Sequence, residues 1–221
     1  MHCKGIRRLA LLCCLGIACL PLGGCSSAQN DRLRIAVIVK ATDSDFWYSV
    51  QSGVSAAATE YNVEVSFEGP ASEEDYSTQI AMIERAVENG ADAIVLSAID
   101  YERVAASVTE AARRGVRVVA IDSAVGSPAV SRFIGTDNYA AGRVHGIGFD
   151  ANTVSVGMLE TGEMDALIVQ NPFAIGYLGV QYAAQLVSGE AEPGEAIYTT
   201  VAVANRENLY DENMQKLLFR F

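Results

Sequence analysis

The side chains of this 221-residue chain that could bind a ligand stand where the predicted strands end. In an open parallel sheet, ligands bind beyond the carboxyl ends of the strands. Five polar residues occupy such positions: Lys40, Ser97, Asp122, Asp150 and Gln170. An aromatic pair, Phe46 and Trp47, follows the first predicted strand. This set suits a neutral polyhydroxylated ligand, because a sugar bonds through its hydroxyls and packs its C–H face on a ring.

Each of these residues also has a simpler interpretation. A strand-end aspartate such as Asp122 often only shapes a turn, a single Lys40 is more often a solvated charge, and Gln170 is also suited to cap the next helix. Phe46 and Trp47 are adjacent and cannot share a helix face, so we expect one in the core and one lining the cleft. The coincidence at five strand ends favours a ligand site.

Signals for catalysis are weak. His145 is the only histidine after the first 24 residues, and the sequence has no Gly-x-Ser-x-Gly elbow, no P-loop and no His/Cys cluster at metal-ligand spacing. The stretch GIGFDA lacks the third glycine of a dinucleotide fingerprint. We therefore expect a binding protein rather than an enzyme, with no metal and no cofactor.

Alternating apolar strands and amphipathic helices position the candidate residues. The predicted strands are RIAVIVK, NVEVSFEG, ADAIVLSA, VRVVAID and SRFIGTDN, and the helices between them cover residues 46–61, 72–89 and 101–114. Strand–helix–strand units of about 30 residues predict parallel strands with right-handed crossovers. We predict an α/β fold class, with a complete Rossmann-like lobe over residues 32–142.

This rhythm breaks after Gly142, where GIGFD follows almost at once in place of a full helix and a new strand. Beyond it, the sequence predicts a helix over residues 153–161, the strand DALIVQ, a helix over 173–188 and a strand pair in GEAIYTTVAVA. We assign residues 143–221 to a second region with a C-terminal tail. This region is too small to repeat the first lobe.

The first residues have the layout of an export signal, with basic residues before the apolar run LALLCCLGIACLPL. We predict a signal peptide over residues 1–24 and a tether over 25–31. LGGC resembles a bacterial lipobox, in which Cys25 receives lipid after cleavage. The alternative is an ordinary signal peptide with an incidental cysteine. The lipobox predicts an exported protein, anchored to the outer face of the bacterial cell membrane or periplasmic, with no other thiol.

The charge balance argues against a nucleic-acid partner. The chain has 16 lysines and arginines against 27 aspartates and glutamates, a net charge of -11. Lys4, Arg7 and Arg8 lie in the predicted signal peptide, so the remainder is more acidic still. An acidic surface repels phosphate backbones.

The order of the motifs resembles the periplasmic sugar-binding proteins of ABC importers, of the ribose, rhamnose and autoinducer-2 type. The resemblance rests on Lys40, Phe46–Trp47, FEGP, VLSA, AIDS, IGTDN, GFDAN and VQNPFAIGYLGV. It implies the type I periplasmic-binding-protein fold shared with LacI-type repressor cores, two lobes that close on a monosaccharide, and a membrane permease as partner. An export signal stands where a repressor carries its helix-turn-helix, which excludes a repressor.

The resemblance also implies roles for the candidate residues. Phe46 and Trp47 would pack on the sugar, and Asp122 would hold its hydroxyls. Ligand contacts from the second lobe or the hinge would come from Asp150 and Gln170. Among the remaining positions, Ser97 stands where some members have asparagine, and Lys40 matches a lysine of the autoinducer-2 and rhamnose branch.

Family members continue through further strand–helix units before they reach the GFD strand, so the break after Gly142 resembles an internal deletion in the second lobe. The missing part normally supplies several sugar contacts. Two functions remain open: a sugar-binding lipoprotein that serves an importer, and a shortened, non-transporting lipoprotein that acts as a sensor or docking partner or is a decayed paralogue. We expect sugar affinity in the millimolar range or weaker, about the level left when several charge-assisted hydrogen bonds are lost.

Overall fold

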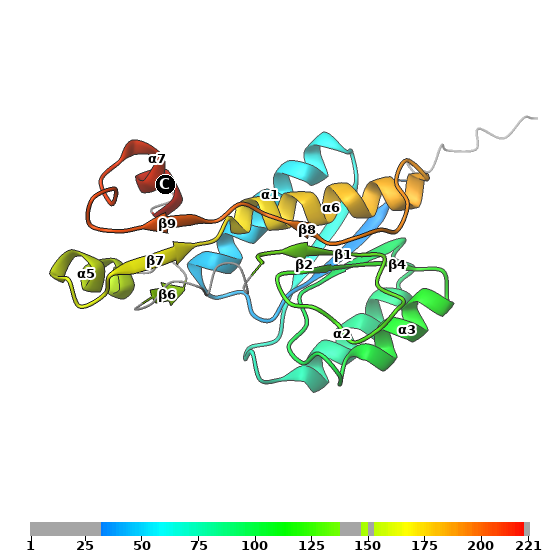
Figure 1. The fold of residues 1–221 in the computed structure, drawn as a ribbon. Helices are drawn as coiled ribbons and strands as arrows, with labels where there is room; N and C mark the ends of the chain where they lie inside the picture. The colour runs from blue at the N-terminus through cyan, green and yellow to red at the C-terminus, as the bar shows by residue number, and fades with distance from the viewer. Residues whose placement is uncertain (1–31, 138–146, 150–152, 219–221) are drawn as a thin grey trace, which may run out of the picture. The chain divides into compact units, whose positions relative to one another are not determined.

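The structure is a computed structural model, and it describes residues 32–137, 147–149 and 153–218 (Figure 1). A six-stranded parallel sheet forms its larger part, in the order β2-β1-β3-β4-β5-β8. Its strands are β1 (Arg34–Ile38), β2 (Glu64–Glu68), β3 (Ala93–Leu96), β4 (Arg117–Ile121), β5 (Arg132–Gly135) and β8 (Ile197–Tyr198). Strands β1, β3 and β4 are almost wholly apolar, as expected for strands that are buried on both faces.

Helices cover both faces of this sheet (Figure 1). On one face, α1 (Asp45–Glu60) and α6 (Pro172–Ser188) pack on Val37, Val95 and Val119. On the other face, α2 (Tyr76–Glu88) and α3 (Ala105–Arg113) pack on Ile38, Ile94 and Val118. Neighbouring strand residues point to opposite faces, so each strand contributes to both cores. The predicted α/β class and the parallel pairing of the strands are confirmed.

Two helices begin a few residues later than the sequence pattern predicted, because side-chain hydrogen bonds shape the residues that precede them. Asp75 caps α2, with its side chain accepting from the Thr78 amide, while Ser72 lies one turn earlier and accepts from the Glu74 amide. Helix α3 starts at Ala105 rather than at residue 101, because the residues before it form a turn around the Asp100 carboxylate.

The sequence pattern assigned all residues after 142 to a second lobe, but α6 and β8 belong with the six-stranded sheet. Strand β8 pairs with β5 in the six-stranded sheet, and α6 packs along α1 and over β4. The boundary itself lies outside the described residues. Two glycines allow the α1–α6 contact: a Cβ on Gly53 would lie 2.0 Å from the Phe173 carbonyl oxygen, and one on Gly176 would lie 2.2 Å from the Val50 carbonyl oxygen.

A smaller sheet contains β6 (Ile147–Phe149), β7 (Ala166–Val169) and β9 (Ala202–Ala204), in the order β6-β7-β9. Strand β6 is parallel to β7, and β9 is antiparallel to it. Helices α5 (Thr153–Thr161) and α7 (Glu212–Leu218) form a small core with Leu167 and Val169. The two strands expected in GEAIYTTVAVA exist as β8 and β9, but they lie in different sheets and do not pair. In the described ranges, no helix is long and apolar enough to cross a bilayer.

Candidate ligand-binding site

The carboxyl ends of β1, β3 and β4 bring three of the predicted site residues together around one carboxylate. Lys40 Nζ lies 3.1 Å from Asp122 Oδ2, and the Ser97 hydroxyl donates to the same oxygen at 2.9 Å. The Ser123 hydroxyl, which the sequence analysis did not single out, also donates to Oδ2 at 3.0 Å. All three contacts therefore fall on one oxygen, and Asp122 Oδ1 receives none of them.

The backbone at Asp122 is strained. Its φ is +58°, in the left-handed region that L-residues other than asparagine and aspartate seldom occupy, and this conformation costs roughly 1–2 kcal/mol. The Asp122 amide donates to the Ile134 carbonyl oxygen at 2.9 Å, which ties the residue to the end of β5. Strain of this kind is retained where the surrounding structure holds it, and it concentrates at ligand-binding sites.

A buried glutamine fixes the strand ends that carry Lys40 and Ser97. The Gln79 side chain is fully buried, and its amide nitrogen donates to the Val39 carbonyl at 3.1 Å and to the Ser97 carbonyl at 2.9 Å. Its amide oxygen accepts from the Ile99 amide at 2.9 Å. Gln79 is not among the residues predicted from the sequence; the signal for it is a polar residue on the inward face of an amphipathic helix.

The aromatic pair divides between the core and the surface. Trp47 is 3% exposed and belongs to the apolar core on the α1 face, and its indole N–H donates to Glu73 Oε1 at 3.0 Å. Phe46 is half-buried, and its ring meets the indole edge-on, with centroids 4.9 Å apart and planes at 89°. The expectation that one ring enters the core is confirmed for Trp47.

Gln170 comes to the same edge of the sheet from the end of β7. Its side-chain amide donates to Thr136 Oγ1, just after β5, at 2.9 Å. Helix α6 is capped by the next residue, Asn171, whose side chain accepts from the Ala174 amide. Capping is therefore the task of Asn171, and the simpler interpretation of Gln170 is wrong. Asp150, His145 and Cys25 lie outside the described residues.

The loops at this edge carry a strong excess of acids. Those that follow β1 to β4 contain Asp43, Glu73, Glu74, Asp75, Asp100, Glu102 and Asp122, against Lys40 and Arg103. Hydrogen bonds from Thr78 and Ser77 lower the pKa of Asp75 to about 2. The Arg103 amide lowers the pKa of Asp100. The negative electrostatic potential of these acids disfavours anionic ligands, and their carboxylate oxygens accept hydrogen bonds from hydroxyl groups.

The arrangement of the described carboxylates can be compared with that of metal ligands. In the part of the chain that the structure describes, His, Cys, Asp and Glu side chains do not gather in a group of three or more that could hold a metal ion. Asp122 Oδ2 already contacts one ammonium group and accepts hydrogen bonds from two hydroxyl groups. These groups are donors to the carboxylate and do not share a metal ion with it.

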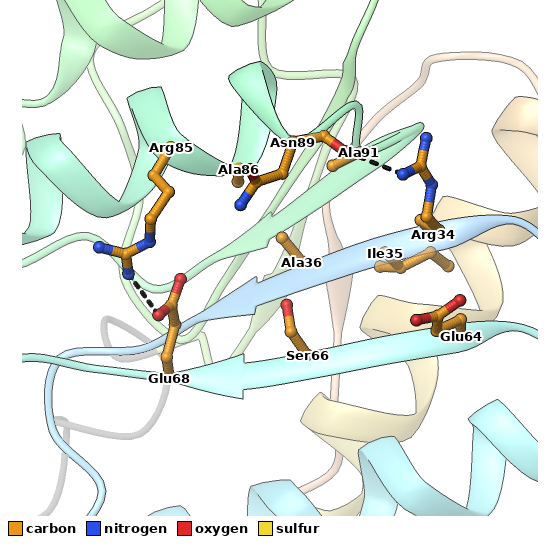
Figure 2. A pocket seen from close by; sticks show the side chains of 10 residues that line it. All are labelled: Arg34, Ile35, Ala36, Glu64, Ser66, Glu68, Arg85, Ala86, Asn89 and Ala91. Carbon is orange, nitrogen blue, oxygen red and sulfur yellow. Dashed lines mark hydrogen bonds and ion pairs between the residues drawn. The ribbon is translucent and has the colours of Figure 1, made fainter.

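A concavity of about 330 Å³ lies between the edge strand β2 and helix α2 (Figure 2). Two of its charged groups face partners within it: Arg85 pairs with Glu68 at 2.6 Å, and Arg34 donates to the Asn89 carbonyl at 2.9 Å. It extends along β2 from Glu64 to Glu68, and neither Lys40 nor Asp122 lines it. We take it as a solvent groove beside an edge strand.

The comparison with known families agrees with this architecture. A model of the periplasmic binding protein domain matches residues 35–147, which is half of the chain. The chain belongs to this family. Among curated relatives, this family member is 28% identical over 139 residues to a D-ribose/D-allose-binding protein of Pseudomonas aeruginosa, covering 58% of this chain and 42% of that protein. It is 26% identical over 119 residues to a xylitol-binding protein of Mycolicibacterium smegmatis, covering 54% and 33%.

Solved structures share the fold of this periplasmic binding protein. A carbohydrate-transporter solute-binding protein of Agrobacterium radiobacter in complex with D-arabinose matches with a TM-score of 0.79 at 20% identity, covering 86% of this chain and 99% of that one. An ABC-transporter solute-binding protein of Agrobacterium vitis with bound D-fucose matches with a TM-score of 0.76 at 23% identity, covering 84% and 100%. The predicted type I fold is confirmed. The chain spans less than half the length of the curated relatives that it matches.

Proposed function

We propose that this protein is a sugar-binding lipoprotein that serves an ABC-type importer. The observation that carries the proposal is the convergence on Asp122, where the ends of three parallel strands hold one carboxylate in a strained backbone and where the contacts from described residues all fall on one of its oxygens. A carboxylate held in this way is preorganised to accept hydrogen bonds from hydroxyl groups. The names of the relatives support the ligand class, since they bind ribose, allose or xylitol.

The site residues divide the recognition of a sugar ring between them. Asp122 Oδ1 accepts from sugar hydroxyls, and Lys40 donates to a hydroxyl with the N–H groups that do not face Asp122. Phe46 packs on the C–H face of the ring. In this proposal Gln170 exchanges its bond to Thr136 for a sugar hydroxyl, and Asp150 adds acceptors from the second lobe.

The acidic edge favours neutral sugars over phosphorylated ones. A phosphate group would enter a field made by acids in four successive loops, with two cations to offset them. Of these cations, Arg103 lies 3.5 Å from Asp100 and stacks on Tyr76, so its charge is already engaged. A free pentose, hexose or polyol is the expected ligand class.

The cellular setting follows from the N-terminal sequence. In the proposal, Cys25 carries the lipid that holds the protein at the outer face of the membrane, or in the periplasm, beside the permease of an importer. Growth with a radiolabelled fatty acid tests this step. Label is expected on the wild-type protein and not on Cys25→Ser, and label on both proteins would contradict it.

The small second sheet limits affinity. Closure of two lobes around a sugar excludes water from it, and a second lobe with three strands among its described residues leaves less surface for this purpose. We expect dissociation constants of about a millimolar, which correspond to about 4 kcal/mol of binding free energy. Micromolar binding would contradict the inferred deletion of sugar contacts.

The experiment that tests the proposal measures sugar binding by the protein from residue 26 onward. Saturation-transfer NMR and thermal melts with ribose, allose, xylitol, arabinose, fucose, rhamnose and autoinducer-2 cover the ligand class, and ribose 5-phosphate is the anionic control. A ligand that binds only the folded state raises the melting midpoint. Saturation transfer to a neutral sugar that disappears in Asp122→Asn supports the proposal. A cooperative melt that no sugar moves, with no transfer signal, overturns it.

A further inference from the structure

A second carboxylate at the edge of the site acts on an aromatic ring and not on the ligand. Glu73 lies in the exposed loop between β2 and α2, and its Oε1 accepts the indole N–H of Trp47 at 3.0 Å. Hydrogen bonds to a charged acceptor are among the stronger ones. The bond therefore fixes the rotation of a ring that is already buried in the core.

The loop that carries Glu73 is held at both ends. At its start, a Cβ on Gly69 would lie 2.9 Å from the Val39 carbonyl oxygen, so the loop packs directly on the β1–α1 connection. At its end, Asp75 accepts from Ser77 and from the amide and hydroxyl of Thr78. Glu73 is thus presented to the indole from a loop with little freedom to withdraw.

Trp47 in turn supports Phe46. The indole is 3% exposed, so it has almost no face to offer a ligand, whereas the neighbouring Phe46 ring is half-buried. The two rings meet edge-to-face at 4.9 Å, an arrangement in which each ring restricts the rotation of the other. Glu73, Trp47 and Phe46 form a continuous chain from the loop to the partly exposed ring.

We propose that Glu73 and Trp47 are positioning residues, and that they hold Phe46 as the one ring of the aromatic pair that packs on the ligand. This inference rests on the proposed sugar-binding function for the role of Phe46. The hold of Glu73 on Trp47 is a property of the unliganded protein. The two parts can therefore be tested separately.

The first test uses the fact that Trp47 is the only tryptophan in the chain. Near-ultraviolet circular dichroism of the tryptophan band and acrylamide quenching of its emission report directly on this side chain. In Glu73→Ala we expect a weaker band and a quenching constant that is higher by about twofold, because the indole gains local freedom. Glu73→Gln retains an acceptor oxygen and is expected to restore both signals.

Glu74→Ala is the matched control. It removes a neighbouring exposed acid of the same charge from the same loop, so a general electrostatic effect would appear in both alanine variants. Unchanged tryptophan signals in Glu73→Ala, or equal changes in Glu74→Ala, would overturn the positioning role of Glu73.

The second test compares sugar binding in the aromatic variants. Phe46→Ala is expected to weaken binding by about threefold to tenfold, the range for loss of an aromatic contact. Trp47→Phe, which keeps a ring in the core, is expected to weaken binding less than Phe46→Ala does. The opposite order would overturn the assignment of Phe46 as the ligand ring. If the wild-type protein binds no sugar, the proposed function fails, and the Glu73–Trp47 hold is still decided by the tryptophan signals.

Discussion

The ammonium nitrogen of Lys40 lies 3.1 Å from Oδ2 of Asp122, so a single ion pair joins the end of β1 to the end of β4. The two side chains are 22% and 15% exposed, which shields the pair from most of the solvent. A pair of this kind is more strongly coupled than one on the open surface, because screening by water is reduced.

We expect the Lys40–Asp122 pair to show a coupling free energy of about 1–2 kcal/mol in a double-mutant cycle with Lys40→Met and Asp122→Asn. Asparagine tolerates the left-handed backbone, so the second variant tests the charge and not the strain. Urea unfolding of the four proteins measures the coupling. The exposed pair of Arg113 and Glu110 is the control, and its cycle should show a smaller coupling. Equal coupling in both cycles would contradict the role assigned to burial.

Gln79→Leu should lower the free energy of unfolding by about 3 kcal/mol, because two buried carbonyl groups and the partly buried Ile99 amide lose their partner. Hydrogen exchange should also become faster at the Ile99 amide, which Gln79 accepts from. The exposed Gln51 of α1 provides the control, and Gln51→Leu should change stability by less than about 0.5 kcal/mol. Similar losses in the two variants would refute the role of Gln79 at the strand ends.

Two glycine-to-alanine changes should have opposite effects on stability, because one glycine lies in the contact between α1 and α6 and the other lies outside it. Gly176→Ala puts a Cβ 2.2 Å from the Val50 carbonyl oxygen, and the resulting shift of a helix should cost about 2–4 kcal/mol. Gly157→Ala in α5 meets nothing within 4 Å and should stabilise the protein by about 0.5 kcal/mol or more. Thermal melts compare the two variants. A neutral Gly176→Ala would mean that the helices are free to separate.

The lowered pKa of Asp75 predicts that the protein loses stability at low pH. Its pKa in the folded state is lowered to about 2 by hydrogen bonds from Thr78 and Ser77, against 3.8 ordinarily. Its contribution is therefore present above about pH 4 and is lost as the pH falls toward 2. Asp75→Asn keeps a capping oxygen but does not titrate, so its stability should fall less over this interval. Parallel acid titrations in urea that remain superimposable would contradict this account.

The local pattern of the sequence determined much of the first lobe. Five strands and three helices in the order β–α–β follow from apolar runs and helical spacing, since these patterns record which side of an element is buried. The parallel order then brings strand ends to one edge, which is why Lys40, Ser97 and Asp122 could be chosen together before their contact was known.

Other features depend on contacts between distant parts of the chain. Gln79 is one example: its helix position shows a polar residue facing inward, but only the fold supplies the two carbonyls and the amide that satisfy it. The division of labour between Phe46 and Trp47 is another. Because the two residues are adjacent, the sequence shows that their rings point to different sides of the helix. Only the fold, through the Glu73 loop and the core around the indole, determines that Trp47 is the buried one.

Helix α6 and strand β8 show most clearly where prediction from the sequence ends. Their existence was predicted, but their sheet was assigned by order along the chain, which placed them in the second lobe. A mostly apolar helix with glycines at its contacts can pack against either sheet, and its own residues do not state which one. The choice belongs to the tertiary structure, because only there do the backbones of α1 and α6 meet closely enough to require Gly53 and Gly176.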